Sequence, residues 1–354
     1  TAAPEGFHPP VTILKPLCGP DPDQLECLRS FLRQDYPAWQ VVFGALDPQD
    51  PALETARRAA AEHPGADVAI VSGGEAFGAN RKVCNLASML PAARHGLLVI
   101  SDSDMRVGPD YLRRVTAPFA DPQVGLVTCP YRGSNPRGLP AVLEALGIGA
   151  DFIPSVLLTN RFWGMRFAFG STIALRRETL DAIGGFHVLA QELADDYLLG
   201  SRVHTRGLRV VLCDYVVDDV LGQETFGEMW TRRLRWARTT RALHPGPTLG
   251  AGITHGTVLA VLLAAASGLA PWALGLLGAT LAVRAATATL IARRCTQDPS
   301  LPRFLPALPL SDLVSFGLWA GSFLGNRVRW RGELFRVERG GRLTPMPPRR
   351  RRAI

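Results

Sequence analysis

The stretch GLLVISDSDMRV, residues 96–107, decides the fold of this chain. Its first half is an apolar run with β-branched residues, which is typical of a buried strand. The run ends at two carboxylates, Asp102 and Asp104, that stand two positions apart. A lone D-x-D pair at the end of a strand either caps the next turn or holds a hard divalent cation. The surrounding sequence has to decide between these two interpretations.

Similar short runs rich in β-branched residues recur at 11–17, 40–46, 67–73 and 124–130. The segments between them have helical spacing, at 21–35, 51–63, 80–94 and 109–120. Strands that alternate with helices predict an α/β fold with a mostly parallel sheet. Ligands of such sheets bind beyond the carboxyl ends of the strands. We therefore expect the residues found there to converge on one edge: Lys15, Pro16, Asp47 and Asp102.

Two motifs in the less regular second half also carry chemistry. The acidic pair at 195–196 precedes an apolar run with helical spacing, so it is either an ordinary helix start or the place of a general base. In RRLRW, residues 232–236, Arg232 and Arg235 share one helix face beside Trp236. Such a helix either lies at a membrane interface or presents arginines to phosphate.

Three segments that contain almost no charge follow, at 251–270, 271–292 and 304–325. Each has the length of about 20 residues that is needed to cross a membrane, although buried core helices would have a similar composition. The chain begins with Thr1 instead of Met, so we expect a natural N-terminus upstream. We predict four parts: a catalytic domain at 1–222, an amphipathic interfacial helix at 223–246, transmembrane helices at 247–325 and a basic cytoplasmic tail at 326–354.

The net positive charge of the chain comes from its C-terminal end. Residues 326–354 contain ten arginines and two glutamates, and this excess equals the net charge of +8 of the whole chain. A basic tail after an apolar block is what the positive-inside rule predicts for the cytoplasmic side of a membrane. Nucleic-acid binding is the weaker interpretation, because no known binding motif accompanies the charge. The six cysteines form no C-x-x-C pair, which favours free thiols in a reducing compartment.

The order of these pieces resembles the ceramide glucosyltransferase family, glycosyltransferase family 21, within the larger GT-A group. The resemblance covers residues 11–243 and extends more loosely to VRWRGELFRV at 328–337. The motifs that carry it are ILKPLCGPD, DYPAWQVVFGALDPQDPA, GANRKVCNL, SDSDMRV, GLVTCPYRG, IGGF, LADDYLLG and RRLRW. It implies a GT-A (Rossmann-like) nucleotide-sugar-binding domain with C-terminal transmembrane or interfacial helices.

The resemblance also implies roles for individual residues. Asp47 is expected near the uracil or ribose of a UDP-sugar. Asp102 and Asp104 are expected at the diphosphate and a divalent metal, Mg²⁺ or Mn²⁺, and Asp196 is the expected catalytic base. The last motif is expected to help hold the diphosphate at the mouth of the site, through Arg232, Arg235 and Trp236.

Two positions depart from the animal ceramide enzymes, which have Gly where Asp104 stands and an expected functional His near Phe152. The motifs are more similar to bacterial members associated with hopanoid biosynthesis, which are thought to add N-acetylglucosamine to a polyhydroxylated hopanoid. The resemblance therefore implies a UDP-sugar donor and a ceramide-type or hopanoid lipid acceptor in the bilayer. It also implies a multi-pass protein of the bacterial inner membrane with a cytoplasmic catalytic domain.

Lysine is rare in this chain, where only Lys15 and Lys82 stand among 39 basic residues, and both lie inside motifs. A lysine ammonium is a compact charge that suits a crowded phosphate site. We therefore hypothesise that Lys82, and less directly Lys15, contacts the diphosphate or the aspartate cluster.

The expected reaction is one displacement that inverts the anomeric centre, in which Asp196 takes the proton of the acceptor hydroxyl and the diphosphate leaves. Two alternatives stay open. A processive polysaccharide synthase shares the aspartates and R-x-x-R-W, and a non-catalytic membrane-anchored protein would bind the nucleotide-sugar without turning it over.

Overall fold

The computed structural model describes residues 6–346, which form two compact units. Unit 1 consists of the chain up to Pro136 together with Ile153–Ala190 and Ala194–Gly222. Unit 2 consists of Arg137–Phe152, Gln191–Leu193 and the chain from Gln223 onward. The chain therefore passes back and forth between the units, and neither unit is one continuous stretch of sequence.

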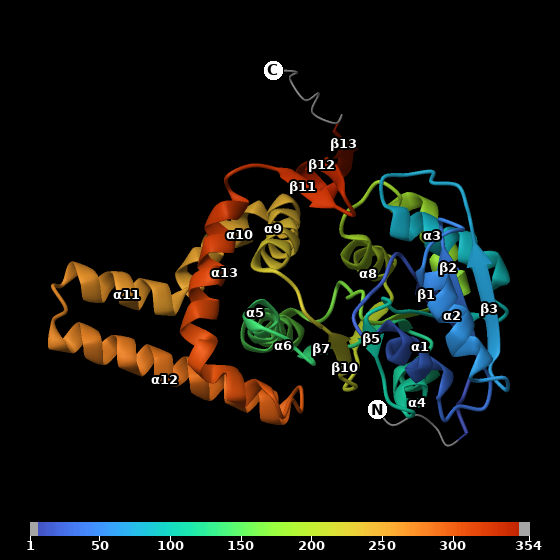
Figure 1. Cartoon of the computed structure of the whole chain (residues 1–354), viewed down its shortest axis with the longest axis horizontal. Coiled ribbons are helices and arrows are strands. Elements are labelled where there is room, and N and C mark those ends of the chain that lie inside the picture. Colours follow the sequence, from blue (N-terminus) through green and yellow to red (C-terminus); the bar gives the residue numbers. More distant parts are fainter. Residues whose placement is uncertain (1–5, 347–354) are drawn as a thin grey trace. The chain divides into compact units, whose positions relative to one another are not determined.

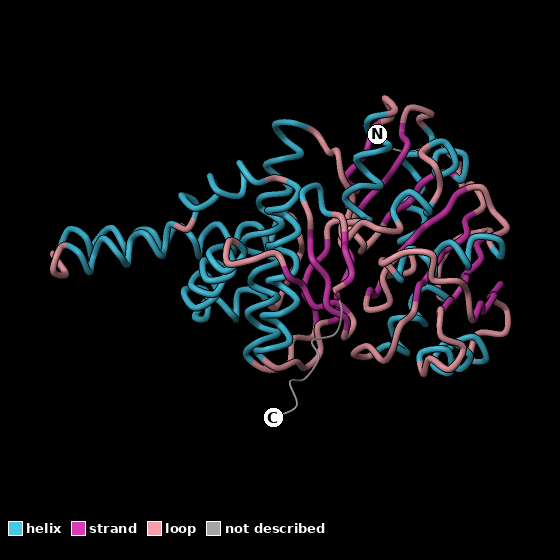
Figure 2. The backbone as a smooth tube through the Cα atoms, turned by 90° about the horizontal axis from the view of Figure 1, so that it is seen from above, coloured by secondary structure: helices cyan, strands magenta, loops and turns pink. Residues whose placement is uncertain are grey.

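A seven-stranded sheet is the centre of unit 1 (Figures 1 and 2). Its strand order is β3-β2-β1-β4-β8-β6-β9, and every pairing is parallel except those of β8 with β4 and β6. This confirms the predicted mostly parallel sheet. The strands are β1 (Val11–Pro16), β2 (Trp39–Ala45), β3 (Asp67–Ser72), β4 (Leu97–Ile100), β6 (Val124–Thr128), β8 (Ile173–Arg176) and β9 (Arg209–Leu212).

Helices follow the strands in the alternation that the sequence predicts. One face of β1 and β2 packs on α1 and α2, where Phe31 and Leu53 join the same buried cluster as Val11 and Val41. Burial of such side chains stabilises each by about 1.5–3 kcal/mol. The helices of unit 1 are α1 (Gln24–Leu32), α2 (Ala52–Ala61), α3 (Arg81–Met89), α4 (Tyr111–Thr116), α6 (Ile153–Trp163), α7 (Arg177–Ala182) and α8 (Asp195–Thr205).

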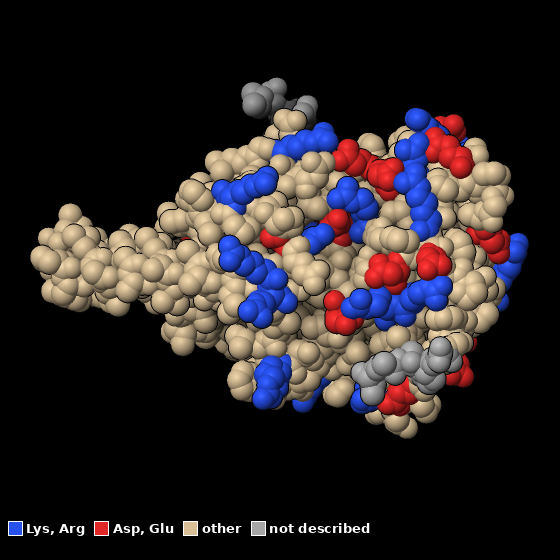
Figure 3. Space-filling model, turned by 90° about the horizontal axis from the view of Figure 1, so that it is seen from below, with Lys and Arg blue, Asp and Glu red and all other residues tan. Residues whose placement is uncertain are grey.

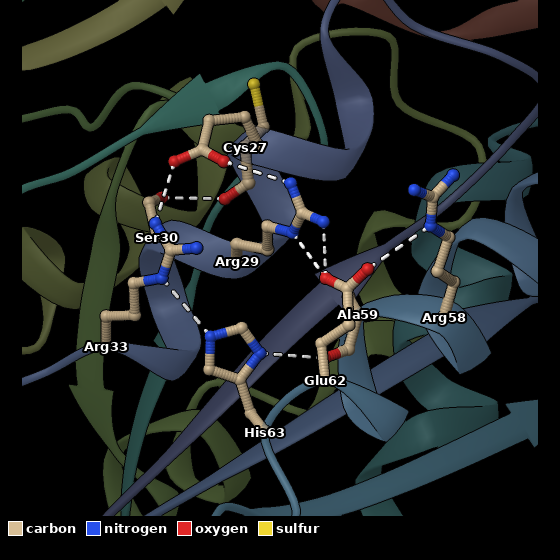
Figure 4. A network of polar contacts seen from close by, with 9 residues as sticks. Cys27, Arg29, Ser30, Arg33, Arg58, Ala59, Glu62 and His63 are labelled. Atoms are coloured by element: carbon tan, nitrogen blue, oxygen red, sulfur yellow. Dashed lines mark hydrogen bonds and ion pairs between the residues drawn. The ribbon is translucent and has the colours of Figure 1, made fainter.

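On their outer side α1 and α2 are joined by polar contacts (Figure 4). Glu62, just after α2, accepts hydrogen bonds from Arg29 Nε at 2.6 Å and from Arg58 Nε at 3.2 Å. Arg33 Nε donates to His63 Nε2 at 3.2 Å. Because these groups face solvent, which screens their charges, they orient the two helices more than they stabilise them.

A smaller sheet fixes the segment directly after the D-x-D motif. It consists of β5 (Met105–Arg106), β10 (Val217–Val220) and β7 (Tyr131–Ser134). Asp218 of β10 accepts hydrogen bonds from Arg106 at 3.1 Å and from Arg132 at 2.7 Å. Three short strands from distant parts of unit 1 therefore hold the D-x-D loop in place.

Unit 2 is mainly helical. Within residues 6–346, three helices are long and apolar enough to cross a membrane: Leu139–Trp163, whose second half belongs to unit 1, Pro271–Arg294 and Leu301–Ser322. The predicted span 251–270 lies in a pair of helices, Pro245–Thr254 and Gly256–Ala266, which is bent by 54° and is long and apolar enough when taken as one span. The helical elements are α5 (Leu139–Leu146), the π-helix η3 (Gly147–Phe152), α9 (Phe226–Leu243), α10 (Pro245–Gly250), η5 (Ala251–Thr254), α11 (Gly256–Ala266), α12 (Pro271–Arg294), η6 (Leu301–Ala307) and α13 (Leu308–Ser322).

The helices α11 and α12 lie side by side as a hairpin (Figures 1 and 2). Residues 256–283 contain no charged side chain, and the end of the hairpin shows none on the face seen in Figure 3. Large apolar side chains are exposed there, among them Trp272, Leu262 and Val283. An exposed apolar surface of this size is typical of contact with a membrane or a partner.

The apolar helices of unit 2 nevertheless contain a charged network. Arg284 of α12 contacts Asp312 of α13 at 2.5 Å and Asp151 of η3 at 2.6 Å. Ser315 Oγ donates to Asp151 at 3.0 Å, and Thr257 donates to Asp312. The network ties α11, α12, α13 and η3 together.

After α13 the chain forms an antiparallel sheet of three strands, β11 (Arg327–Trp330), β12 (Glu333–Val337) and β13 (Leu343–Pro345). Part of the predicted basic tail is therefore folded, and its last eight residues, 347–354, lie outside the described residues. None of the six cysteines, all of which lie within the described residues, forms a disulfide.

Candidate functional site

The polar groups of unit 1 gather beyond the carboxyl ends of β1 and β4. Lys15 is the next-to-last residue of β1, and Asp102 follows the last residue of β4 by two positions. The first turns of α3 and α8 bring Lys82 and the acidic pair 195–196 to the same place. Of the residues expected to converge, Lys15 and Asp102 thus lie together, and two further segments, which carry Lys82 and the acidic pair, join them.

Lys82 lies between the two acidic motifs. Its Nζ contacts Asp102 Oδ1 at 2.5 Å and Asp195 Oδ2 at 3.7 Å. The side chain of Lys82 is only 15% exposed. Burial works against its charge, but the carboxylates of Asp102, Asp195 and Asp196 outweigh burial and raise the pKa of Lys82. Lys82 is therefore a permanent cation in the middle of the aspartates.

Asn80 orients this arrangement from the start of α3. Its Oδ1 accepts from Val83 N at 3.1 Å, which makes Asn80 the N-cap of the helix. Its Nδ2 donates to Asp195 Oδ1 at 3.0 Å. One buried side chain thus fixes both the helix that carries Lys82 and the carboxylate that faces it.

Gly170, just before β8, joins the other members of the site. Asp102 N donates to Gly170 O at 3.1 Å, and Gly170 N donates to Asp196 Oδ2 at 3.1 Å. A Cβ atom at this position would lie 2.3 Å from Asp102 Oδ2 and 3.3 Å from Lys82 Nζ. Any side chain at this position would therefore displace the carboxylate of Asp102.

Asp196 has the properties of a general base. Burial, together with the neighbouring Asp195, raises its pKa to about 6, while Lys82 acts in the opposite direction. One carboxylate oxygen accepts from Gly170 N and the other from Tyr197 N at 2.7 Å. A carboxylate with a pKa near the working pH is suited to proton transfer.

Lys15 lies beneath the site. It is fully buried, its Nζ donates to the backbone carbonyl of Asp102, and it lies 3.9 Å from the centroid of the Phe31 ring. Burial lowers the pKa of Lys15 to about 8. Pro16 ends β1 opposite Gly44 of β2, so it shapes the strand end and offers no polar side chain.

Asp104 has a carboxylate atom without a partner. Its Oδ1 is buried and makes no hydrogen bond. Burial, together with Asp102 and Asp21, raises the pKa of Asp104 to about 7. A hard cation would satisfy this oxygen, so Asp102 and Asp104 fit a divalent metal that takes its remaining ligands from a diphosphate. Within residues 6–346 no three His, Cys, Asp or Glu side chains form a ready-made metal cluster.

Asp47 stands apart from this group. It is exposed in the loop after β2, where its Oδ1 accepts from Gln49 N at 2.9 Å. The same loop is tied to the loop after β1, because both carboxylate oxygens of Asp50 accept from Gly19 N at 2.9 Å. The two loops thus form one rim, to which Asp47 belongs.

The R-x-x-R-W residues lie on α9 in unit 2. Arg232 makes a bidentate ion pair with Glu224 at 2.8 and 2.9 Å and approaches the buried Glu144 at 3.6 Å. Arg235 lies over the rings of Trp236 and Trp330, at 5.9 and 5.5 Å. A diphosphate would have to compete with Glu224 for the guanidinium of Arg232.

Sequence reasoning did not single out Asn80 or Gly170. Asn80 had a usable signal, because an Asn directly before a helical run is a typical N-cap. For Gly170 there was none, since its importance depends on contacts with Asp102, 68 positions before it, and Asp196, 26 positions after it, which only the fold brings together.

Comparison with solved structures shows the fold type. The structure is similar to that of the mannosyltransferase PcManGT from Pyrobaculum calidifontis, solved in complex with GDP-Man and Mn²⁺. The TM-score is 0.56, the sequence identity is 24%, and the likeness covers 91% of this chain and 89% of that one. The chain therefore has a GT-A-like glycosyltransferase fold.

Comparison of sequences points to the same class. The profile of glycosyl transferase family 21 matches residues 1–343. Ceramide glucosyltransferase 1 of Caenorhabditis elegans is 28% identical over 244 residues, 68% of this chain and 52% of that protein. Ceramide glucosyltransferase of Komagataella phaffii is 34% identical over 108 residues, 29% of this chain and 21% of that protein. The chain spans about half the length of the first of these relatives.

Proposed function

Because the chain belongs to glycosyltransferase family 21, we propose that it transfers a hexose from a UDP-sugar to a hydroxyl group of a membrane lipid, with inversion at the anomeric carbon. The observation that carries this proposal is the contact chain in unit 1. Asp196 is hydrogen-bonded to Gly170, Gly170 to Asp102, and Asp102 to Lys82. A group suited to proton removal and groups suited to diphosphate binding are thus neighbours.

The reaction needs one base and one good leaving group. Asp196 takes the proton from the acceptor hydroxyl while the oxygen of that hydroxyl attacks the anomeric carbon. The bond from that carbon to the diphosphate oxygen breaks, and UDP leaves with the electron pair. Attack from the face opposite the leaving group converts an α-linked donor into a β-glycoside. The diphosphate leaves without a second carboxylic acid, unlike the leaving group of a glycosidase.

The negative charge that develops on the diphosphate has to be stabilised. Lys82 is a fixed cation 2.5 Å from Asp102, and a preorganised charge of this kind lowers the barrier without reorganisation. Asp102 and Asp104 would hold a divalent cation, Mg²⁺ or Mn²⁺, which when bound neutralises diphosphate charge. Asp47 on the rim is the proposed contact of the uridine, and Arg235 with Trp236 the proposed contact at the mouth of the site.

The lipid nature of the acceptor rests on the apolar helices and on the named relatives, which are ceramide glucosyltransferases. We infer a ceramide-type or hopanoid acceptor that stays in the bilayer while its hydroxyl reacts. The proposed location is the bacterial inner membrane, with several spans and a cytoplasmic catalytic unit.

The test is transfer by the full chain reconstituted in nanodiscs. It is incubated with UDP-glucose, UDP-N-acetylglucosamine, UDP-galactose or GDP-mannose, and with ceramide or a polyhydroxylated hopanoid. Product lipids are weighed by mass spectrometry, and the anomeric configuration is read by NMR. A β-linked product with one added hexose is expected. A lipid that carries a chain of sugars would instead identify a processive synthase.

The base is tested with Asp196→Asn, which keeps the shape of the side chain but cannot take a proton. Turnover should fall by about 10²–10⁴-fold, while binding of the UDP-sugar is retained. Asp67→Asn is the matched control, because Asp67 lies on β3 in an ion pair with Arg94 on the surface. Near-normal turnover of Asp196→Asn would refute the assignment of the base.

A further inference from the structure

The C-terminal sheet of unit 2 carries arginines that face one another. Arg327 of β11 is directly opposite Arg336 of β12, and Arg329 lies two residues further along the same face. All three are exposed, whereas Val328 and Phe335, on the opposite face, are buried. Like charges directly opposite each other destabilise a pair of strands. The repulsion between these arginines destabilises the sheet, and a bound anion would cancel that repulsion.

Helix α9 adds two more arginines to this sheet. Arg238 donates to the backbone carbonyl of Arg327, and Arg241 Nη2 donates to Gly325 O at 2.8 Å. The Nε atoms of Arg238 and Arg241 are buried and have no hydrogen-bond partner. Within the described part of the chain, none of the arginines 238, 241, 327, 329 and 336 forms an ion pair with a carboxylate. We call these five residues the arginine surface.

Apolar side chains flank the arginine surface where the chain leaves α13. Phe323 and Leu324 follow the apolar helix Leu301–Ser322 and are 38% and 83% exposed. The guanidinium of Arg241 lies 5.8 Å from the centroid of the Phe323 ring. Apolar residues that continue directly into arginines are typical of the boundary between hydrocarbon and headgroups.

We propose that the arginine surface binds the phosphate groups of anionic phospholipids in the leaflet next to the end of α13. Three observations support this occupant over others. The charge is uncompensated, unsatisfied guanidinium atoms point to a missing acceptor, and an exposed apolar pair lies beside them. This inference does not depend on the proposed transfer reaction, since it concerns the surface by which unit 2 meets the membrane.

The test uses the full chain in neutral detergent and soluble short-chain lipids. Dihexanoyl phosphatidylglycerol and dihexanoyl phosphatidylcholine are titrated below their micelle concentrations, and binding is followed by isothermal calorimetry. The triple variant Arg327→Gln, Arg329→Gln, Arg336→Gln removes the three exposed members of the arginine surface. The control variant Arg33→Gln, Arg57→Gln, Arg58→Gln removes the same charge from α2 and the end of α1.

We expect wild type and control to bind phosphatidylglycerol in preference to phosphatidylcholine. In the triple variant, affinity for phosphatidylglycerol should fall about a hundredfold, or about fivefold per arginine. Equal binding of the two lipids by wild type, or an equal loss in the control variant, would overturn the inference. So would inorganic phosphate or an oligonucleotide of matched charge that binds as tightly as the lipid at the same ionic strength.

Discussion

Gly170 is the residue on which the candidate site depends most directly. In Gly170→Ala the added methyl group would lie 2.3 Å from Asp102 Oδ2, so the carboxylate that contacts Lys82 has to shift. A displacement of about 1 Å in a catalytic group is expected to lower turnover by about 100-fold. The measurement is kcat and donor KM in nanodiscs. Gly65→Ala is the control, because a Cβ there meets no atom within 4 Å.

Unfolding of Gly170→Ala should remain cooperative, since the clash lies in the site and not in the core. If the variant keeps wild-type kcat and KM, the close approach of Gly170 to Asp102 has no catalytic importance.

With Asp196 as the proposed base, we expect the pKa of its carboxylate to set the pH dependence of transfer. The base has to be ionised, so kcat/KM should fall as the pH decreases through about 6, the raised pKa of Asp196. Lys82 lowers this pKa, so in Lys82→Met the decrease of kcat/KM on the acidic side of the pH profile, its acidic limb, should move to higher pH. Lys82→Arg keeps the charge and should leave the limb in place, even where the fork geometry of Arg slows turnover.

The profile is recorded as kcat/KM between pH 4.5 and 8.5, a range that brackets the pKa of about 6. A limb that stays fixed in Lys82→Met would show that another group titrates.

The sequence predicted these residues unevenly. Asp102 and the pair 195–196 could be found because each stands at a strand end or a helix start, where side chains point to the functional edge. Lys82 could be found because lysine is rare in this chain. Asn80 could have been found from its position directly before a helical run, whereas Gly170 acts through contacts between segments far apart in the chain, which no local pattern encodes. The roles of these residues, like those of Asp47, Arg232, Arg235 and Trp236, remain predictions.

At the scale of elements, the charged network of Arg284 is a structural requirement of unit 2. Its guanidinium is shared by Asp312, which is 8% exposed at the side chain, and by Asp151. Arg284→Ala leaves these carboxylates without their cation, and breaking a buried pair in this way costs about 3–5 kcal/mol. The free energy of unfolding is measured by denaturant titration in detergent.

Arg293→Ala is the control for this experiment. Arg293 lies exposed near the end of the same helix, and its loss should change the free energy of unfolding by no more than about 0.5 kcal/mol. Arg284→Met combined with Asp312→Leu should be less destabilised than Arg284→Ala, because no charge at Asp312 is then left unpaired. Equal stability of Arg284→Ala and Arg293→Ala would mean that the network contributes nothing.

The parallel strands could be predicted because each is a short apolar run between turn residues. The span Leu139–Trp163 was missed, since Glu144, Asp151 and several Gly and Pro residues interrupt its apolar pattern. Glu144 is 2% exposed and lies 3.6 Å from both Arg232 and Arg233. The carboxylate that interrupts the apolar pattern of this helix is therefore paired in the fold. The break in 251–270 at His255 likewise has no clear sequence signal.

At the scale of the whole molecule, the two units are interleaved along the chain. The segment Arg137–Phe152 belongs to unit 2 although unit 1 continues on both sides of it. Within unit 2, Leu143 packs in a cluster with Met229 and Val314, and Leu146 in a cluster with Leu301 and Leu308. Leu143 and Leu146 are 1% and 0% exposed. A cut after residue 222 therefore removes the residues that cover them.

We accordingly predict that residues 1–222 expressed alone will aggregate or require detergent, because α5 would expose its apolar face. Size-exclusion chromatography and thermal unfolding of this fragment provide the measurement, with the full chain in detergent as the reference. Replacing Leu143 and Leu146 by Glu in the fragment should restore a monomer, whereas the same pair in the full chain should destabilise unit 2. An unmodified fragment that is monomeric without detergent and binds UDP would show that α5 does not need unit 2. In that case the catalytic unit folds independently of the membrane helices.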